Sequence, residues 1–187
     1  MNISLPILFL FSSALSCSFK SMNYKDVKIL WWEGTEVVIN SDFLENLKEE
    51  EKAVLALIST YAGGECIYEN NELNCTLTSA LGLGTQCSDK HLSFVKKWFL
   101  KDYEVYTSLN DCYSVPYTAT NQTKFSEINI SRDGINIIVY MNFHSVYSAD
   151  LISYQWKQKE TFELKDGFLY LIEKVVYDEI EKSLNFE

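Results

Sequence analysis

Two ionisable side chains in the second half of the chain have the type and setting that acid–base chemistry requires. His144 ends a predicted strand whose alternation places Tyr140 and Asn142 on the same side. Such a histidine is a candidate general base or ligand donor, and the alternative is a hydrogen-bonded histidine at a sheet edge. Glu160 shares a predicted strand face with Trp156, so an apolar pocket there would raise the pKa of its carboxyl, and the alternative is an exposed face. We predict one pocket or contact face that bears all five residues.

The rest of the sequence offers no catalytic or nucleotide-binding motif. The one S-x-x-K match, Ser93 to Lys96, lacks the companion S-D-N and K-T-G motifs and is attributed to chance. His91 falls in the first turn of a predicted helix and is expected to face solvent. No catalytic residue and no cofactor are predicted, and whether the chain is an enzyme stays open.

The cysteines favour disulfide bonds over a metal site. There are five, Cys17, Cys66, Cys75, Cys87 and Cys112. The last four can form two disulfides in an oxidising compartment, with three possible pairings. We favour Cys66–Cys75 and Cys87–Cys112, because each closes a short segment. A zinc site is not expected, since no C-x-x-C occurs and the two histidines lie far apart in sequence.

The N-terminus predicts export and accounts for the odd cysteine. Residues 1–16 carry no charged side chain, and their apolar run is shorter than the ~20 residues that a membrane-spanning helix needs. The run fits a secretory signal, although no Lys or Arg precedes it. Its end, Ala14-Leu15-Ser16-Cys17, resembles a relaxed bacterial lipobox, which implies cleavage before Cys17 and a lipid on its thiol. The alternative is an ordinary signal peptide and a secreted protein with Cys17 left free.

Composition limits the domain count and the partners. The predicted division is a signal peptide at 1–16, a tether at 17–24 and one α+β domain at 25–187. The 187 residues are 47% apolar and carry a net charge of −10. An acidic surface argues against nucleic acid and against an anionic membrane face, and it permits a basic protein partner.

Four antiparallel strands are predicted to position the candidate residues. Two Asp-Gly turns, at Asp133-Gly134 and Asp166-Gly167, separate alternating apolar runs, which is a strong hairpin signal. The strands are expected at residues 124–132, 135–144, 153–164 and 168–177. In the second strand, alternation predicts a core face of Ile135, Ile137, Val139, Met141 and Phe143.

The remaining segments are predicted to surround this meander. A separate N-terminal hairpin is expected around Glu33-Gly34. From Asp42 to Gly63-Gly64 we expect either two helices or one helix with an acidic, solvated middle at 49–51. A hairpin at 66–76 carries two cysteines, and Ser88 caps a helix that runs to about Lys101. A short helix is predicted at 178–187.

Helices followed by a long curved meander with a Lys-Asp-Gly turn resemble the NTF2-like, cystatin-like α+β cone over roughly residues 88–177. The segment FVKKWFLKDY at 94–103 also resembles an aromatic helix of uncharacterised bacterial envelope proteins of this type. The resemblance implies a conical cavity between sheet and helices, used for catalysis, small-ligand binding or protein contacts, with no universal catalytic residue. The N-terminal hairpin and the cysteine-bearing insert depart from that pattern.

The expectation for function follows from these features together. The chain is predicted to be a lipid-anchored, exported, non-catalytic protein of the bacterial cell envelope. Its partner would be a basic protein, such as a toxin or a wall hydrolase, or a small apolar ligand. The alternative is an enzyme or a small-molecule carrier that uses a cone pocket.

Overall fold

The protein has an α+β fold built on one antiparallel six-stranded sheet with strand order β2-β1-β5-β6-β7-β8. The computed structural model describes residues 24–62, 66–69, 72–112, 121–147 and 152–183. The predicted signal peptide, Cys17 and most of the predicted tether lie outside these residues. The strands of the sheet are β1 (Tyr24–Glu33), β2 (Glu36–Ile39), β5 (Asn121–Asp133), β6 (Asn136–Tyr147), β7 (Ile152–Lys165) and β8 (Phe168–Ser183).

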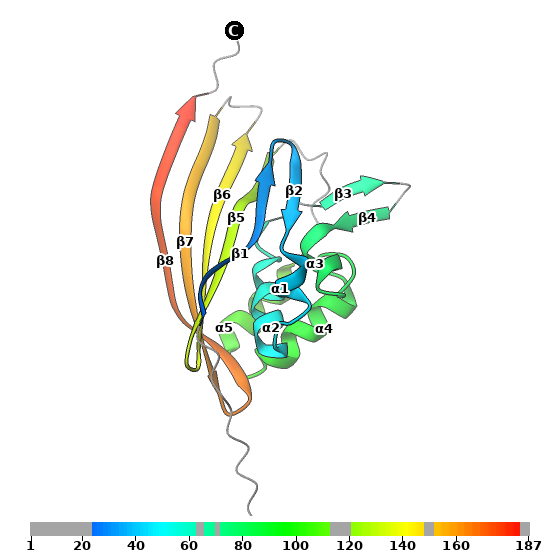
Figure 1. Ribbon diagram of the computed structural model, residues 1–187, viewed down its shortest axis with the longest axis vertical. Helices are drawn as coiled ribbons and strands as arrows, with labels where there is room; N and C mark the ends of the chain where they lie inside the picture. The colour runs from blue at the N-terminus through cyan, green and yellow to red at the C-terminus, as the bar shows by residue number, and fades with distance from the viewer. Residues whose placement is uncertain (1–23, 63–65, 70–71, 113–120, 148–151, 184–187) are drawn as a thin grey trace, which may run out of the picture.

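The helices lie together against one end of one face of this sheet, as Figure 1 shows. We call the face toward the helices the inner face and the opposite one the outer face. The helices are α1 (Ser41–Leu44), α2 (Glu49–Ile58), α3 (Thr76–Ala80), α4 (Asp89–Trp98) and α5 (Tyr103–Ser108), followed by the 3-10 turn η1 (Leu109–Asp111). At the other end of the sheet, β6, β7 and β8 extend past the helices (Figure 1).

The sheet has six strands rather than the four predicted. β5 to β8 are consecutive neighbours in it, and the N-terminal hairpin β1–β2 is not separate, because β1 pairs antiparallel with β5. β1 already begins at Tyr24, inside the predicted tether. The structure thus has an open six-stranded sheet, and the hairpin removes the edge that β5 would otherwise expose.

β8 continues to Ser183, so the helix predicted at 178–187 is wrong for its described part. β7 offers a paired neighbour along this whole stretch, which outweighs the weak helical spacing of the sequence. An extra residue in β8 opposite Trp156 forms a β-bulge, and Asp178 beside it has φ 54°. The bulge exchanges the faces on which the residues after it lie.

Both hairpins are present, and the turn predicted at Asp166-Gly167 is confirmed, with positive φ angles of 52° and 79°. The first turn lies one residue later than predicted: Asp133 pairs with Asn136 as the last residue of β5, and Gly134, with φ 61°, and Ile135 form the turn. Four residues of the predicted core face of β6 are buried, namely Ile137, Val139, Met141 and Phe143. Ile135 was predicted among them but is 54% exposed, because it belongs to the turn that precedes β6.

The segment from Asp42 forms two helices, and its acidic run is solvated only in part, because Glu49 is exposed whereas Glu51 is buried. Asn40, rather than Asp42, caps α1, and its side chain accepts a hydrogen bond from the Phe43 amide. Glu51 is buried, and its carboxylate lies 2.6 Å from the Arg132 guanidinium, which also contacts Glu50 at 2.9 Å. The acidic run therefore joins α2 to β5 through a buried ion pair.

The two favoured disulfides are present. Cys66 at the start of β3 (Cys66–Glu69) is bonded to Cys75 at the end of β4 (Glu72–Cys75). Cys87, just before α4, is bonded to Cys112 after η1. Ser88 caps α4 as predicted, with its hydroxyl accepting from the His91 amide. The first bond closes the β3–β4 hairpin and the second joins the two ends of the segment from α4 to η1, and both are compatible with an exported protein.

Candidate functional site

The register of β6 against β7 divides the predicted site between two faces of the sheet. Phe143 pairs with Trp156 and Val139 pairs with Glu160, so Trp156 and Glu160 lie on the inner face. His144 pairs with Gln155, which places His144, and with it Tyr140 and Asn142, on the outer face. The prediction of one shared face is wrong, because alternation orders residues within a strand and only register matches one strand to the next.

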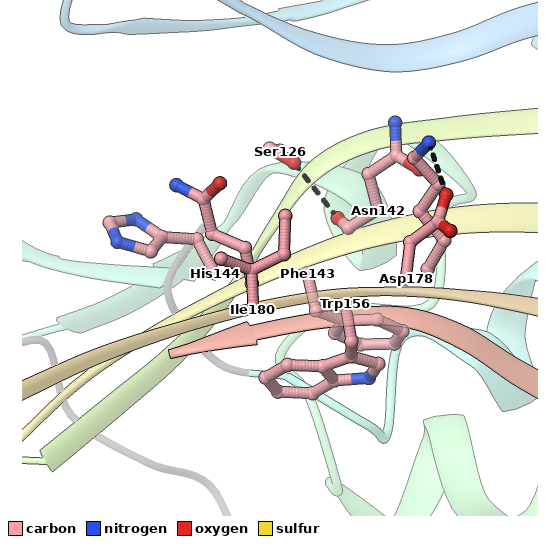
Figure 2. Close-up of a pocket in the computed structure, with 9 residues that line it drawn as sticks. Ser126, Asn142, Phe143, His144, Trp156, Asp178 and Ile180 are labelled. Carbon is pink, nitrogen blue, oxygen red and sulfur yellow. Dashed lines mark hydrogen bonds and ion pairs between the residues drawn. The ribbon is translucent and has the colours of Figure 1, made fainter. Parts of the chain in front are cut away.

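His144 lies in an open hollow of about 410 Å³ on the outer face, which we call the outer hollow. Figure 2 shows its side chain and that of Ile180 on one side of the sheet, with the rings of Phe143 and Trp156 on the other. The hollow is lined by Ser126, Asn142, Phe143, His144, Gln155, Trp156, Lys157, Asp178 and Ile180.

The outer hollow does not assemble an activated nucleophile. Burial, and then the charges of Lys124 and Lys182, lower the pKa of His144, so its imidazole is neutral at pH 7. The Ser126 hydroxyl donates to the Asn142 carbonyl at 3.1 Å rather than to His144. Asp178 forms an ion pair with Lys157 at 2.8 Å, which Figure 2 marks. Among the residues described, none pairs with His144 as a nucleophile would.

Glu160 is buried beneath the helices, and both of its oxygens accept hydrogen bonds. Tyr61 donates at 3.1 Å, Gln158 donates at 2.7 Å, and the Lys174 ammonium lies at 3.2 Å. Burial raises the pKa of Glu160, while Lys174, Tyr61 and Gln158 act to lower it. Burial and the nearby Glu160 carboxylate raise the pKa of Tyr61. The group connects the end of α2 to β7 and β8, on the opposite face from His144.

His91 is buried, contrary to the prediction that it faces solvent. α4 turns this residue toward α2, where its Nε2 lies 2.8 Å from the Ala56 carbonyl and 3.2 Å from the Ser59 hydroxyl. Its Nδ1 accepts from the Cys87 amide at 2.9 Å, so the ring proton is on Nε2. Because Nε2 is a donor and burial lowers the pKa of His91, this Ser–His contact is not a nucleophile–base pair.

A second hollow lies on the inner face, where the sheet extends past the helices. It has a volume of about 330 Å³. We call it the aromatic hollow, and it is lined by Ser145, Tyr147, Tyr154, Trp156, Val176 and Glu179. The rings of Tyr147 and Tyr154 meet at 89° with centroids 5.6 Å apart. The Trp156 ring stacks on Phe143 at 4.8 Å and 8°, which fixes its orientation against the core.

Among the described residues that line it, the aromatic hollow has one carboxylate and no lysine or arginine. Glu179 is exposed, and its carboxylate forms no ion pair with the other residues described. The sequence identified Trp156, and alternation in the strand predicted at 153–164 puts Tyr154 on the same face. The other lining residues, Tyr147, Ser145, Val176 and Glu179, were not predicted. Continued alternation from Phe143 would have found Ser145 and Tyr147. Glu179 follows the bulge at Asp178, which shifts the alternation of β8 and could not be foreseen.

No protein-family model, no curated protein and no solved structure matches this chain. Within the part of the chain that the structure describes, no helix is long and apolar enough to cross a membrane. The same residues contain no group of three or more His, Cys, Asp or Glu side chains arranged to hold a metal ion.

Proposed function

We propose that this chain is an exported, lipid-anchored, non-catalytic binding protein whose aromatic hollow takes a small organic cation. The observation that carries the proposal is the lining itself. Two tyrosines at right angles and a tryptophan surround an open space, beside a carboxylate that forms no ion pair with the other described residues. The proposed ligand is a quaternary ammonium group or a similar cation with an apolar surface.

The physical basis is the charge distribution of aromatic rings. Each ring carries partial negative charge on its faces, and a cation within about 6 Å of a ring centroid gains roughly 0.5–2 kcal/mol, more when water is excluded. Because Tyr147 and Tyr154 are perpendicular, they can contact a roughly spherical cation from two sides. Glu179 adds an opposite charge, and the net charge of −10 favours the approach of cations over anions.

The absence of catalysis rests on the positions of the two candidate acid–base residues. His144 and Glu160 lie on opposite faces of the sheet, and both Glu160 oxygens are occupied. An enzyme that used both would need them to converge on one cavity. A carrier that uses the cone pocket of NTF2-like proteins remains the alternative, and the aromatic hollow is the described space such a carrier would use.

The anchor is proposed from the lipobox at Cys17, and the two disulfides are compatible with export. Replacing Cys17 with Ala is expected to abolish fatty-acid labelling of the protein and to release it from the envelope. Unchanged labelling of the Cys17→Ala protein would refute lipid attachment at this thiol and leave the secreted form. This result is independent of what the hollow binds.

Binding is tested by titrating the purified protein with choline and, separately, with 3,3-dimethylbutanol, its uncharged analogue of the same shape. The proposal predicts that choline binds and that the uncharged analogue binds at least tenfold more weakly. Tyr154→Leu is expected to weaken choline binding about tenfold, since it removes one ring of the pair. Tyr140→Leu, a tyrosine on the outer face, is the matched control and should bind like the wild type. Equal affinity for both compounds, or no binding of either, would refute a cation site.

The net charge of −10 supports a second candidate, a basic protein partner such as a toxin or a wall hydrolase. Such a complex would form fast and weaken with salt, because its attraction is long-range and screened. Capture with the full protein from cell-envelope extract should then give one dominant basic protein that 0.5 M salt releases. Recovery of none at low salt would count against this candidate, whatever the choline titration shows.

A further inference from the structure

β8 forms one edge of the sheet, and no strand of the described chain other than β7 pairs with it, although its Leu171 amide donates to the Asp102 carboxylate at 2.9 Å. It is 16 residues long, and it contacts only β7 within the sheet. Its apolar side chains are unusually exposed, with Ile172 at 52%, Val175 at 41%, Val176 at 51%, Tyr177 at 37% and Ile180 at 48%. A long edge strand with exposed apolar residues is a template for pairing with another strand.

When β8 is paired antiparallel with β8 of a second copy, one register places opposite charges across from each other. In this register the residue numbers of opposite residues add to 355, and the twofold axis passes between Tyr177 and Asp178. Each acidic residue at the ends of the paired segment then faces a basic one. The opposite residues are Glu173 with Lys182, Lys174 with Glu181, and Val175 with Ile180. Every one of these pairs occurs twice, because the axis relates the two strands.

Because of the bulge in β8, residues that are opposite each other in this register lie on the same face of the sheet. Glu173, Val175 and Tyr177 lie on the outer face, since they pair with Thr161, Lys159 and Lys157 of β7. After the extra residue, Ile180 and Lys182 also lie on the outer face. Without the bulge, an odd-numbered and an even-numbered residue would point to opposite faces, and Glu173 could not meet Lys182.

Lys174 and Glu181 show the same agreement on the inner face, where they pair with Glu160 and Tyr154. The inner-face ion pair of Lys174 with Glu160 and the outer-face ion pair of Glu173 with Lys159 would each gain a further opposite charge from the second strand. The added charges would extend two existing ion pairs rather than break them.

We propose that the partner of this edge is a second copy of the chain, paired through residues 173–182 of β8 about a twofold axis. The two sheets then form one sheet of twelve strands, held by roughly ten added backbone hydrogen bonds. In this register Val176 of one copy lies opposite Glu179 of the other. Both residues line the aromatic hollow, so each copy supplies residues next to the hollow of its neighbour.

Cysteine cross-linking of the full protein tests the register. In the double variant Val175→Cys with Ile180→Cys, the two thiols are about 16 Å apart along one strand, too far for a disulfide within the chain. Across the axis they face each other, so mild oxidation should give a covalent dimer. The control is Ile172→Cys with Val175→Cys, which adds two thiols to the same strand but places neither opposite another. It should stay uncross-linked.

Sedimentation equilibrium tests the charge match without new thiols. Lys182→Glu places a second carboxylate opposite Glu173, twice in each dimer, and is expected to raise the dimer dissociation constant about tenfold. Adding Glu173→Lys should restore the wild-type constant. Lys25→Glu, an exposed lysine on β1, makes the same change in net charge and should leave dimerisation unchanged.

Three outcomes would overturn the proposal. A protein that stays monomeric at every concentration has another occupant on this edge or none. If Lys182→Glu leaves the dimer dissociation constant unchanged, the dimer forms through a different surface. Equal cross-linking of the two double-cysteine variants would mean that β8 pairs in another register or that the thiols meet by collision. Each measurement is made without ligand and does not depend on what the aromatic hollow binds.

Discussion

The inner face of the sheet has two ends that share the same strands and differ in what covers them. At one end the helices cover Phe162, which packs edge-on against Phe99, and the Glu160–Tyr61 group. At the other end no helix of the described chain covers the strands (Figure 1), and Trp156 and Tyr154 line the aromatic hollow. Both oxygens of the buried Glu160 at the covered end accept hydrogen bonds, whereas Glu179 at the open end is exposed.

In the proposed function, this difference lets one sheet supply both a core and a binding surface. β6 and β7 continue the same alternation through both ends, so the strands alone do not distinguish them. The length of the helical layer, closed by the disulfide from Cys87 to Cys112, decides where the core stops. We therefore expect mutations at the covered end to act on stability and mutations at the open end to act on binding.

The largest expected effect is at the covered end. Arg132→Leu leaves Glu51 buried without its cation, and the cost should be about 3–5 kcal/mol of unfolding free energy. Chemical denaturation measures it. Lys28→Met is the matched control, because the ion pair of Lys28 with Glu127 is solvent-exposed and contributes at most about 1 kcal/mol. Equal losses in the two variants would contradict the comparison.

A smaller effect at the covered end depends on pH. Burial lowers the pKa of His91 in the folded state, so below about pH 6.5 the unfolded chain binds a proton that the folded chain does not. Stability should therefore fall as the pH drops below about 6.5, by at most about 1.4 kcal/mol per pH unit from this residue. Denaturation midpoints between pH 7.5 and 5 should show a flatter slope for His91→Gln.

His144 provides the control for that pH dependence. Its pKa is also lowered, but its ring lies in the open outer hollow rather than between two helices. His144→Gln should therefore change the slope less than His91→Gln. A larger change in slope for His144→Gln than for His91→Gln would mean that the outer face, and not the helical layer, determines how stability responds to acid.

The smallest expected effect concerns the outer face alone. Lys182→Gln removes one of the two charges that add to burial in lowering the pKa of His144, so this pKa should rise. It should stay below its ordinary value, because burial is the larger cause. An NMR titration of the imidazole protons measures the shift, and a pKa above about 6.5 in the variant would contradict this ranking.

Much of the fold could be predicted from the sequence, because it depends on local signals. The two Asp-Gly pairs indicated where the hairpins lie, and alternation identified the buried face of β6. The even number of cysteines after Cys17 indicated two disulfides, and the favoured pairing is the one observed. The pairing of β1 with β5 spans about 100 residues of sequence and has no local signal. The buried pair of Glu51 with Arg132 was hidden for the same reason, since an acidic run looks solvated until its distant cation is known.

The candidate site was predicted only in part, for reasons of register. Trp156 was found because a large aromatic residue in an alternating strand is visible in the sequence. His144 and Glu160 were grouped with it wrongly, because one residue of register decides which face a neighbouring strand presents. The position of Glu179 on the inner face depends on a β-bulge. The sequence could not indicate this bulge, because the spacing of apolar residues there favoured a helix.

The central claim is that the open end of the inner face binds an organic cation, and NMR of the protein with added tetramethylammonium tests it directly. The account predicts upfield shifts of the methyl protons from the aromatic rings, and shift changes at Tyr147, Tyr154 and Trp156. The imidazole signals of His144 on the outer face should not move. Changes confined to His144 and its neighbours, or none at any protein signal, would contradict the claim.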